Sequence, residues 1–221
     1  MKAAKKTGTA GRGRGKRAYH HGDLQVALIE ATLALIEQRG IQGFTLKDAA
    51  AMAGVSTAAP YRHFADKEAL LRAIQDEGFQ RFNAALAAGY ARAGTPESRI
   101  EELGVAYVRF ALEYPAYIRV MFGMGGEDVQ DGDKQYKDRH HDENAKGFLL
   151  LVKAVDAVHP EATLEFRNDL VAASWSIVHG FALLQMENAF AVMGDTGEVE
   201  ERLRRALRRT VSKAGGAAAE A

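Results

Sequence analysis

The sequence has no cysteine among its 221 residues, and it has only four prolines. The absence of cysteine excludes disulfides, thiolate metal sites and cysteine nucleophiles. No run of 18 apolar residues occurs, and the basic N-terminus lacks the apolar segment of a signal peptide. Hydrophobic residues make up 47% of the chain, which excludes disorder throughout. We therefore expect a soluble, cytoplasmic protein with one large domain, or a small domain joined to a mid-sized one.

Signatures of enzymes and of metal sites are also missing. The chain contains no GxSxG, no HExxH and no carboxylate pair whose spacing implies a shared site. The segment GRGRGK has no Walker spacing, and Asp128, Asp131 and Asp133 lack the spacing and the closing Glu of an EF-hand. We therefore expect no enzymatic activity, no cofactor and no metal.

Two histidine-containing segments need separate consideration as metal sites. His20 and His21 form a pair, but no other ligand can be assigned to them. Residues 140–143, HHDE, look more like a metal cluster. Consecutive residues on a helix point in different directions, however, so we interpret this segment as a solvated charged face.

The charge of the chain is balanced overall but unevenly distributed. Residues 1–72 hold 12 Lys and Arg against 6 Asp and Glu, and the remaining residues hold 17 against 23. Seven of the basic residues precede the first acidic residue, Asp23, and small residues separate them. We interpret residues 1–18 as a flexible basic arm that attracts nucleic acid without sequence preference. A solvated tail that only aids solubility is the alternative.

Apolar residues recur at helical spacing throughout, and no alternating strand pattern appears, so the predicted class is all-α. The first helix should end at Gly40. Thr45 should cap a second, short helix, with Asp48 completing a capping box, and Gly54 should reverse the chain. A third helix should start at Ser56 or Thr57. A fourth should begin at Asp66 and run toward Gly89.

The rest of the chain predicts a larger set of helices. Thr95 and Pro96 mark a helix start, and Tyr114-Pro115 interrupts that helix before a short apolar segment, 116–122. A Gly- and Asp-rich loop should follow at about 123–134, and a helix should resume by Phe148. After His159-Pro160 comes a long helix, about 163–192, with two apolar faces. The last helix, about 198–212, precedes a flexible tail, 214–221.

The two faces of the long helix predict different neighbours. Val171, Trp175, Val178 and Ala182 form one face, which we expect in the core of its own chain. The second face should be offered to a partner helix, and it consists of Leu170, Ile177, Phe181 and Leu184.

Residues 45–64 have the parts of a helix-turn-helix: a small Ala50 where two helices cross closely, Gly54 at the turn and Val55 beneath it. Together with the flanking segments, this region resembles the TetR family of bacterial transcription regulators over residues 19–82. The matching runs are YHHGDLQVALIEATLALIEQRG and FTLKDAAAMAGVSTAAPYRHFADKEALLRAI. The later run WSIVHGFALL, with Trp175, His179 and Gly180, resembles the C-terminal domain of one branch of the family.

The resemblance implies an all-α fold in which a three-helix DNA-binding domain is joined by a fourth helix to a larger domain. That larger domain, residues 83–213, would dimerise through helices 163–192 and 198–212 and bind a small hydrophobic or aromatic effector. The implied partner is a double-stranded DNA operator, and no membrane is involved. The implied function is a homodimeric regulator, usually a repressor, that an effector releases from a pseudo-palindromic operator.

The resemblance also assigns DNA contacts residue by residue. Thr45 and Lys47 fall where the family touches the DNA backbone and nearby bases, and Tyr61, His63 and Lys67 match phosphate-contacting positions. The start of the recognition helix, which meets base edges, is formed by Ser56, Thr57, Ala58 and Ala59. Alanine can contact a thymine methyl but cannot form a bidentate base contact, so specificity should depend on Thr57, Lys47, DNA shape or the arm.

Some of these residues also have purely structural interpretations. Tyr61 is alternatively a core aromatic residue, His63 a capping residue, and Thr45 a helix cap whether or not it touches DNA. Pro60 replaces the leucine common at its position in the family and lacks a backbone N–H. We expect the recognition helix to tolerate it with an altered docking angle.

The candidate effector pocket lies between the helices of the C-terminal domain, where aromatic and methionine side chains occupy inward-looking positions. Most of these are expected in the core. The candidate pocket residues are Phe82, Tyr107, Phe110, Met121, Phe122, Phe148, Trp175 and His179. Two other functions stay open from the sequence: a nonspecific DNA-binding protein, and a small helical enzyme that uses this pocket.

Overall fold

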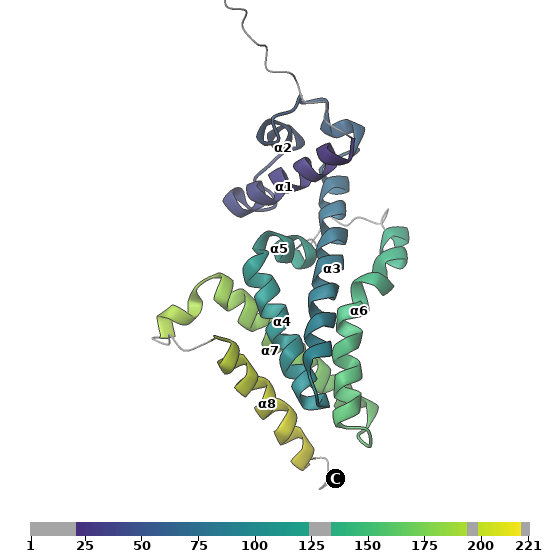
Figure 1. Ribbon diagram of the computed structural model, residues 1–221, viewed down its shortest axis with the longest axis vertical. Coiled ribbons are helices and arrows are strands. Elements are labelled where there is room, and N and C mark those ends of the chain that lie inside the picture. The colour runs from purple at the N-terminus through teal and green to yellow at the C-terminus, as the bar shows by residue number, and fades with distance from the viewer. Residues whose placement is uncertain (1–20, 124–133, 194–198, 218–221) are drawn as a thin grey trace, which may run out of the picture.

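A computed structural model describes residues 21–123, 134–193 and 199–217 of the chain (Figure 1). These residues form helices joined by turns, without a strand in the described ranges. The predicted arm at 1–18, His20, most of the loop at 123–134 and part of the tail at 214–221 lie outside them, as do the side chains of His21 and of residues 140–143. The elements are α1 (His21–Arg39), α2 (Leu46–Met52), the 3₁₀ helix η1 (Pro60–Arg62), α3 (Lys67–Arg92), α4 (Pro96–Glu113), α5 (Pro115–Gly123), α6 (Lys134–Val158), α7 (Leu164–Met186), the 3₁₀ helix η3 (Ala189–Met193) and α8 (Val199–Ala217).

The first two helices end and begin where the sequence predicts. Gly40 has φ +75° and follows the last residue of α1, and its N–H donates to the Ile36 carbonyl at 2.9 Å. Thr45 and Asp48 form the predicted capping box at the start of α2. Gly54 has φ +70°, a conformation that costs a residue with a Cβ but not glycine. The turn after α2 is therefore set by local sequence.

Helix α3 joins the two parts of the molecule, which we call the head, residues 21–66, and the body, residues 96–217. Asp66 caps α3 by accepting from the Ala69 N–H at 2.7 Å. The helix leaves the head and runs into the body beside α4 and α6 (Figure 1). Its N-terminal half buries Leu70, Leu71 and Ile74, whereas Phe82 and Leu86 lie in the core of the body. Head and body thus share one continuous helix.

Helices α4 and α5 are separated by Pro115, as predicted. Thr95 caps α4 with Pro96 in its first turn, and α4 ends at Glu113 because Pro115 cannot continue its backbone hydrogen bonds. Helix α5 then packs against both α1 and α3, and the Gln75 Nε2 donates to the Met121 carbonyl at 3.3 Å. The short apolar helix is therefore a second connection between body and head.

Helix α7 is shorter than predicted. It ends at Met186 rather than near 192, because Asn188 adopts φ +54° and the chain continues as η3. Val171, Val178 and Ala182 are buried as expected, and Trp175 is half-buried. Of the face predicted to meet a partner, Leu170 is buried in its own chain, but Leu184 is 44% exposed.

Helix α8 packs against α4 and α7 and completes the body. Its apolar residues Leu203 and Leu207 are fully buried. Three arginine–glutamate pairs join α8 to α4 from the outside: Arg109 with Glu200 at 2.6 Å, Arg204 with Glu102 at 2.7 Å, and Arg208 with Glu101 at 2.9 Å. In the described residues, no helix is long and apolar enough to cross a membrane.

Candidate DNA-binding surface and ligand cavity

The start of α2 presents Thr45 and Lys47 at the surface of the head. The Thr45 hydroxyl donates to Asp48 Oδ2 at 2.6 Å and accepts from the Asp48 N–H at 3.2 Å. The hydrogen bonds from Thr45 hold the pKa of Asp48 below its ordinary value. The Thr45 proton is thus already used within the capping box, whereas Lys47 is exposed and takes no part in that box.

The recognition segment, Ser56 to His63, is not the regular α-helix that the sequence predicts. Ala59 N–H donates to the Ser56 carbonyl at 2.9 Å, and η1 covers only residues 60–62. An α-helix capped at Ser56 would need the N–H of residue 60 to donate to the Ser56 carbonyl, and Pro60 has no N–H. The expectation that a regular helix tolerates Pro60 is wrong, because a turn at residues 56–59 and η1 stand where the recognition helix was predicted.

Despite this tighter turn, the segment presents the predicted residues on the surface. Ser56, Thr57 and Ala58 are exposed, and Ala59 is half-buried. Tyr61 is 54% exposed, so the alternative interpretation as a core aromatic residue is wrong.

The end of the segment also contains an exposed arginine that the sequence reasoning missed. Arg62 is exposed, whereas His63, at the C-cap of η1, is half-buried. The sequence does contain a sign of this residue, because Arg39 and Arg62 are the two arginines between the basic arm and α3. Lys67 in the first turn of α3 lies with its Nζ 4.4 Å from the centre of the Phe44 ring. This contact holds the ammonium at the helix N-terminus, where backbone N–H groups also favour phosphate.

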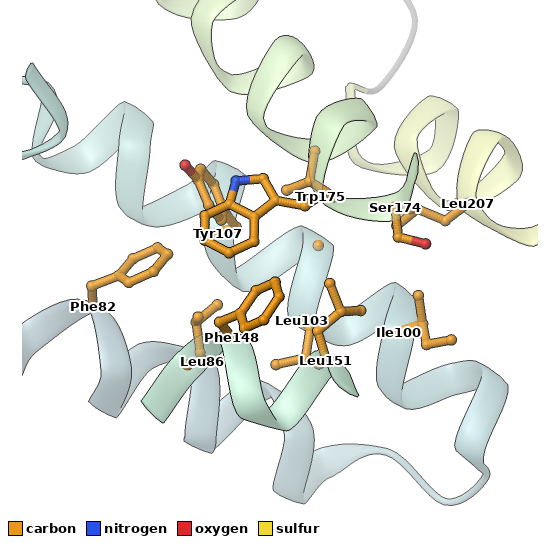
Figure 2. Close-up of a pocket in the computed structure, with 13 residues that line it drawn as sticks. Phe82, Leu86, Ile100, Leu103, Tyr107, Phe148, Leu151, Ser174, Trp175 and Leu207 are labelled. Carbon is orange, nitrogen blue, oxygen red and sulfur yellow. The ribbon is translucent and has the colours of Figure 1, made fainter. Parts of the chain in front are cut away.

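The body contains an apolar cavity between five helices, with a volume of about 50 Å³ (Figure 2). Of the candidate pocket residues, Phe82, Tyr107, Phe148 and Trp175 line it. Phe110, Met121, Phe122 and His179 do not line it. Phe110 packs against the Phe82 ring, and Phe122 and His179 pack against the Tyr107 ring. The sequence analysis named none of its other lining residues as pocket residues, and these are Leu86, Ile100, Leu103, Gly104, Gly147, Leu151, Ser174, Val178 and Leu207.

Glycines allow the helices around this cavity to approach closely. A Cβ on Gly147 of α6 would lie 2.5 Å from Leu86 Cδ1, and its N–H donates to Asn83 Oδ1 at 2.8 Å. A Cβ on Gly104 of α4 would lie 2.6 Å from Leu207 Cδ1. These close approaches fix the walls of the cavity, and the sequence alone gives no sign of which helices meet there.

A hydrogen bond between Tyr107 and His179 crosses the body next to the cavity. The Tyr107 hydroxyl and His179 Nδ1 are 2.6 Å apart, and Phe122 packs against both rings. Burial raises the pKa of Tyr107 well above its ordinary value and lowers the pKa of His179 below 6.5. Both side chains are therefore neutral at pH 7. In this state one hydrogen bond joins them.

His179 and Phe122 face a second, more open cavity of about 600 Å³ between head and body. The head contributes Arg39, Gly40, Ile41 and Gln42 to its wall, and the body contributes residues of α5 and α7. The Tyr107–His179 pair thus lies between the apolar cavity and the junction with the head.

Comparisons with known proteins agree with this arrangement. Residues 28–74 match a model described as bacterial regulatory proteins, tetR family, and residues 100–209 match a model described as tetracyclin repressor-like, C-terminal domain. Among curated proteins, none matches the chain. A solved protein of unknown function from Rhodococcus sp. RHA1 is 27% identical, with a TM-score of 0.71, over 90% of this chain and 98% of its own.

Two solved regulators share the fold at lower identity. A tetR family regulatory protein from Rhodococcus RHA1 is 18% identical, with a TM-score of 0.58, over 85% of this chain and 96% of its own. A TetR family transcriptional regulator from Thermus thermophilus is 17% identical, with a TM-score of 0.63, over 84% of this chain and 97% of its own.

Proposed function

The chain belongs to the tetR family of bacterial regulatory proteins, and from this we propose that it is a homodimeric repressor which a small molecule releases from its operator. As a member of this family, the chain is a DNA-binding transcriptional regulator. The observation that carries the proposal is the exposed recognition segment, flanked by basic side chains at the starts of α2 and α3. A repressor acts on the genome, which places it in the cytoplasm.

Residues of the head take two roles in this proposal. Ser56, Thr57 and Ala58 enter the major groove, where Thr57 supplies the polar contact to a base edge. Side chains at the end of the segment and at the starts of α2 and α3 bind phosphates and set its position on the duplex without reading sequence, and they are Lys47, Tyr61, Arg62, His63 and Lys67. Thr45, whose proton is used in the capping box, positions the start of α2 against the duplex. Alanines 58 and 59 contribute shape and methyl contacts, so DNA deformability and the basic arm add to specificity.

Dimerisation places two such segments on successive major grooves, about 34 Å apart on a pseudo-palindrome. Exposed leucines on α7 support this helix as the interface. Leu164 is 67% exposed and Leu184 is 44% exposed, and a single chain gains nothing by presenting them to water. Helix α8, which packs beside α7, completes the proposed interface.

The apolar cavity is the proposed effector site. The effector binds better to a dimer whose recognition segments are wrongly spaced for the operator, so it lowers the affinity of the protein for DNA. The coupling is reciprocal, and DNA lowers the affinity for the effector by the same factor. We also assign the chain to the branch marked by Trp175, His179 and Gly180, because two of these residues lie at the cavity and beside it.

The proposed function is tested by mixing the purified protein with fragmented DNA of its own genome at near-physiological salt. The retained fragments are then sequenced. We expect a few fragments that share an inverted repeat. Uniform recovery with a steep salt dependence would support a nonspecific DNA-binding protein instead. Turnover of a compound in the cavity would support the alternative function of a small helical enzyme.

A further inference from the structure

The open cavity between head and body is large enough for a small organic molecule. Its volume is about 600 Å³, and sites for such molecules usually measure roughly 300–1,000 Å³. Residues 39–42 of the head, at the end of α1 and just after it, form one wall. Residues of α5 and α7 form the other, and α5 lies between α1 and the rest of the body (Figure 1). A molecule in this cavity therefore touches both parts of the protein.

The charged side chains that line this cavity have the same sign. Arg39 comes from the last turn of α1 and Arg119 from α5, and both are exposed. Among the described residues, no Asp or Glu lines the cavity. Arg39 Nη1 lies 3.7 Å from Asp48 Oδ1, and an exposed ion pair of this kind is weak. The Arg39 guanidinium therefore keeps donors for a ligand, and the cavity attracts an anion.

His179 adds a neutral polar group to the same cavity. Its Nδ1 forms the hydrogen bond with the Tyr107 hydroxyl, so Nε2 is the ring nitrogen that remains for a ligand. With the Tyr107 hydroxyl as donor, the proton of the neutral imidazole lies on Nε2, which then donates. This arrangement suits an anion, because it adds a donor to the two guanidinium groups.

The rest of the wall is mainly apolar. Ile41, Ile118, Phe122 and Leu183 line it, and Leu183 is 38% exposed. Covering exposed apolar surface with an apolar ligand is favourable. An inorganic anion would leave this surface in water, and a hydrocarbon would leave the guanidinium groups without a partner. A ligand with a charged head group and an apolar chain uses both kinds of wall.

We propose that the open cavity binds an amphipathic organic acid, with its carboxylate at the two arginines and its chain against the apolar wall. Guanidinium groups bind planar carboxylates through paired N–H donors. Because Asp48 already takes part of the Arg39 charge, the site suits a head group with one negative charge rather than two. None of the described residues lines both cavities, so this site is separate from the proposed effector site. The bound acid bridges head and body and holds the head in one orientation.

The test is isothermal titration calorimetry of the full-length protein without DNA. Octanoate carries both parts of the proposed ligand, octanol has the chain without the charge, and acetate has the charge without the chain. We expect octanoate to bind about ten times more tightly than octanol, and acetate to give no binding heat. Octanol or acetate binding as tightly as octanoate, or no binding of octanoate, would overturn the proposal.

Variants then locate the site. Arg119→Gln in the body and Arg39→Gln in the head should each weaken octanoate about tenfold and leave octanol unchanged. Arg92→Gln is the matched control, because Arg92 is also exposed, has a similarly loose ion pair of 3.8 Å with Glu102, and lies at the far end of α3. An effect in only one of the two cavity variants, or in neither, would refute a carboxylate that bridges head and body. Should Arg39→Gln fail to fold, Arg39→Lys replaces it, since lysine keeps the charge but not the paired donors.

The same variants distinguish this site from the apolar cavity of the body. No charged side chain among the described residues lines that cavity, so binding there would not depend on either arginine. Leu183→Ala should weaken octanoate and octanol by the same factor, because it removes apolar surface that both chains contact. Unchanged binding of both probes would contradict a chain at this wall. Retention of genomic DNA is measured on the same preparation without octanoate, so failure of the proposed repressor and failure of this site are distinguishable.

Discussion

The head and the body of this protein hold their functional groups in opposite ways. In the head, most of the groups proposed to meet DNA are exposed, and the start of α2 is set by a neighbour three residues away, in the Thr45–Asp48 capping box. In the body, the groups around the cavity are buried or half-buried and meet across the fold, as Tyr107 and His179 do over 72 residues. The head is thus suited to a rigid, extended ligand, whereas the body can enclose a small one.

The largest expected effect on this difference between head and body comes from removing Phe82, the central aromatic residue of the body. Phe82 is 5% exposed, and its ring packs edge-on against Tyr107 at 4.9 Å and Phe110 at 5.3 Å. Phe82→Ala should lower the free energy of unfolding by about 3–5 kcal/mol, measured by urea denaturation. Phe79→Ala, at a half-buried position on the same helix, should cost less than half as much. Equal losses would contradict the placement of the body core at Phe82.

The second prediction separates phosphate contacts from base contacts within the head. Lys67→Ala should weaken binding to all duplexes about tenfold and reduce the slope of log affinity against log salt by about one. Thr57→Ala should mainly reduce the preference for the operator over other DNA. Both are measured by fluorescence anisotropy at several salt concentrations. The reverse pattern would show that the two roles are wrongly assigned.

The third prediction compares two buried hydroxyl groups, one in the head and one in the body. Thr32→Val removes a hydroxyl that is hydrogen-bonded in the head, and it should lower the free energy of unfolding by about 1 kcal/mol. Ser174→Ala removes a hydroxyl without a partner in the body, and it should raise that free energy by about 1 kcal/mol. A loss of stability in Ser174→Ala would mean that its hydroxyl is already satisfied in the ligand-free protein.

The smallest expected effect is a pH dependence from His179. Burial lowers its pKa in the folded state below the ordinary 6.5, so the unfolded chain takes up the proton first as pH falls. The contribution of neutral His179 to the free energy of unfolding is therefore fully present above about pH 6.5, and it is lost as the pH falls below that value. Thermal unfolding of the natural protein and of His179→Gln should converge as pH falls from 7.5 to 5. A constant difference between them would contradict a half-buried, neutral His179.

The fold of the head could be predicted from sequence because its signals are local. Gly40, Thr45, Gly54 and Asp66 act within one turn of the chain, and each has the predicted conformation or cap. The exception is the recognition segment. There a turn and η1 form around Pro60 instead of an α-helix, and helical periodicity alone gave the wrong geometry.

The cavity could be predicted only in part, because its walls depend on which helices meet. Aromatic residues such as Phe82 and Trp175 were identified by their size, but Gly104 and Ser174 were not, since small residues occur throughout the sequence. The end of α7 was also missed, because apolar residues continue into η3 while Asn188 reverses the backbone. Local chemistry therefore predicted helix ends and caps better than long-range contacts.

The central claim is that residues 45–67 of the head read a specific DNA sequence. It is tested most directly by measuring the affinity of the full-length protein for a recovered inverted repeat and for a scrambled duplex of the same length, at near-physiological salt. The account predicts that the inverted repeat binds at least about 10³ times more tightly. Equal affinities for the two duplexes, with the same salt dependence, would contradict it.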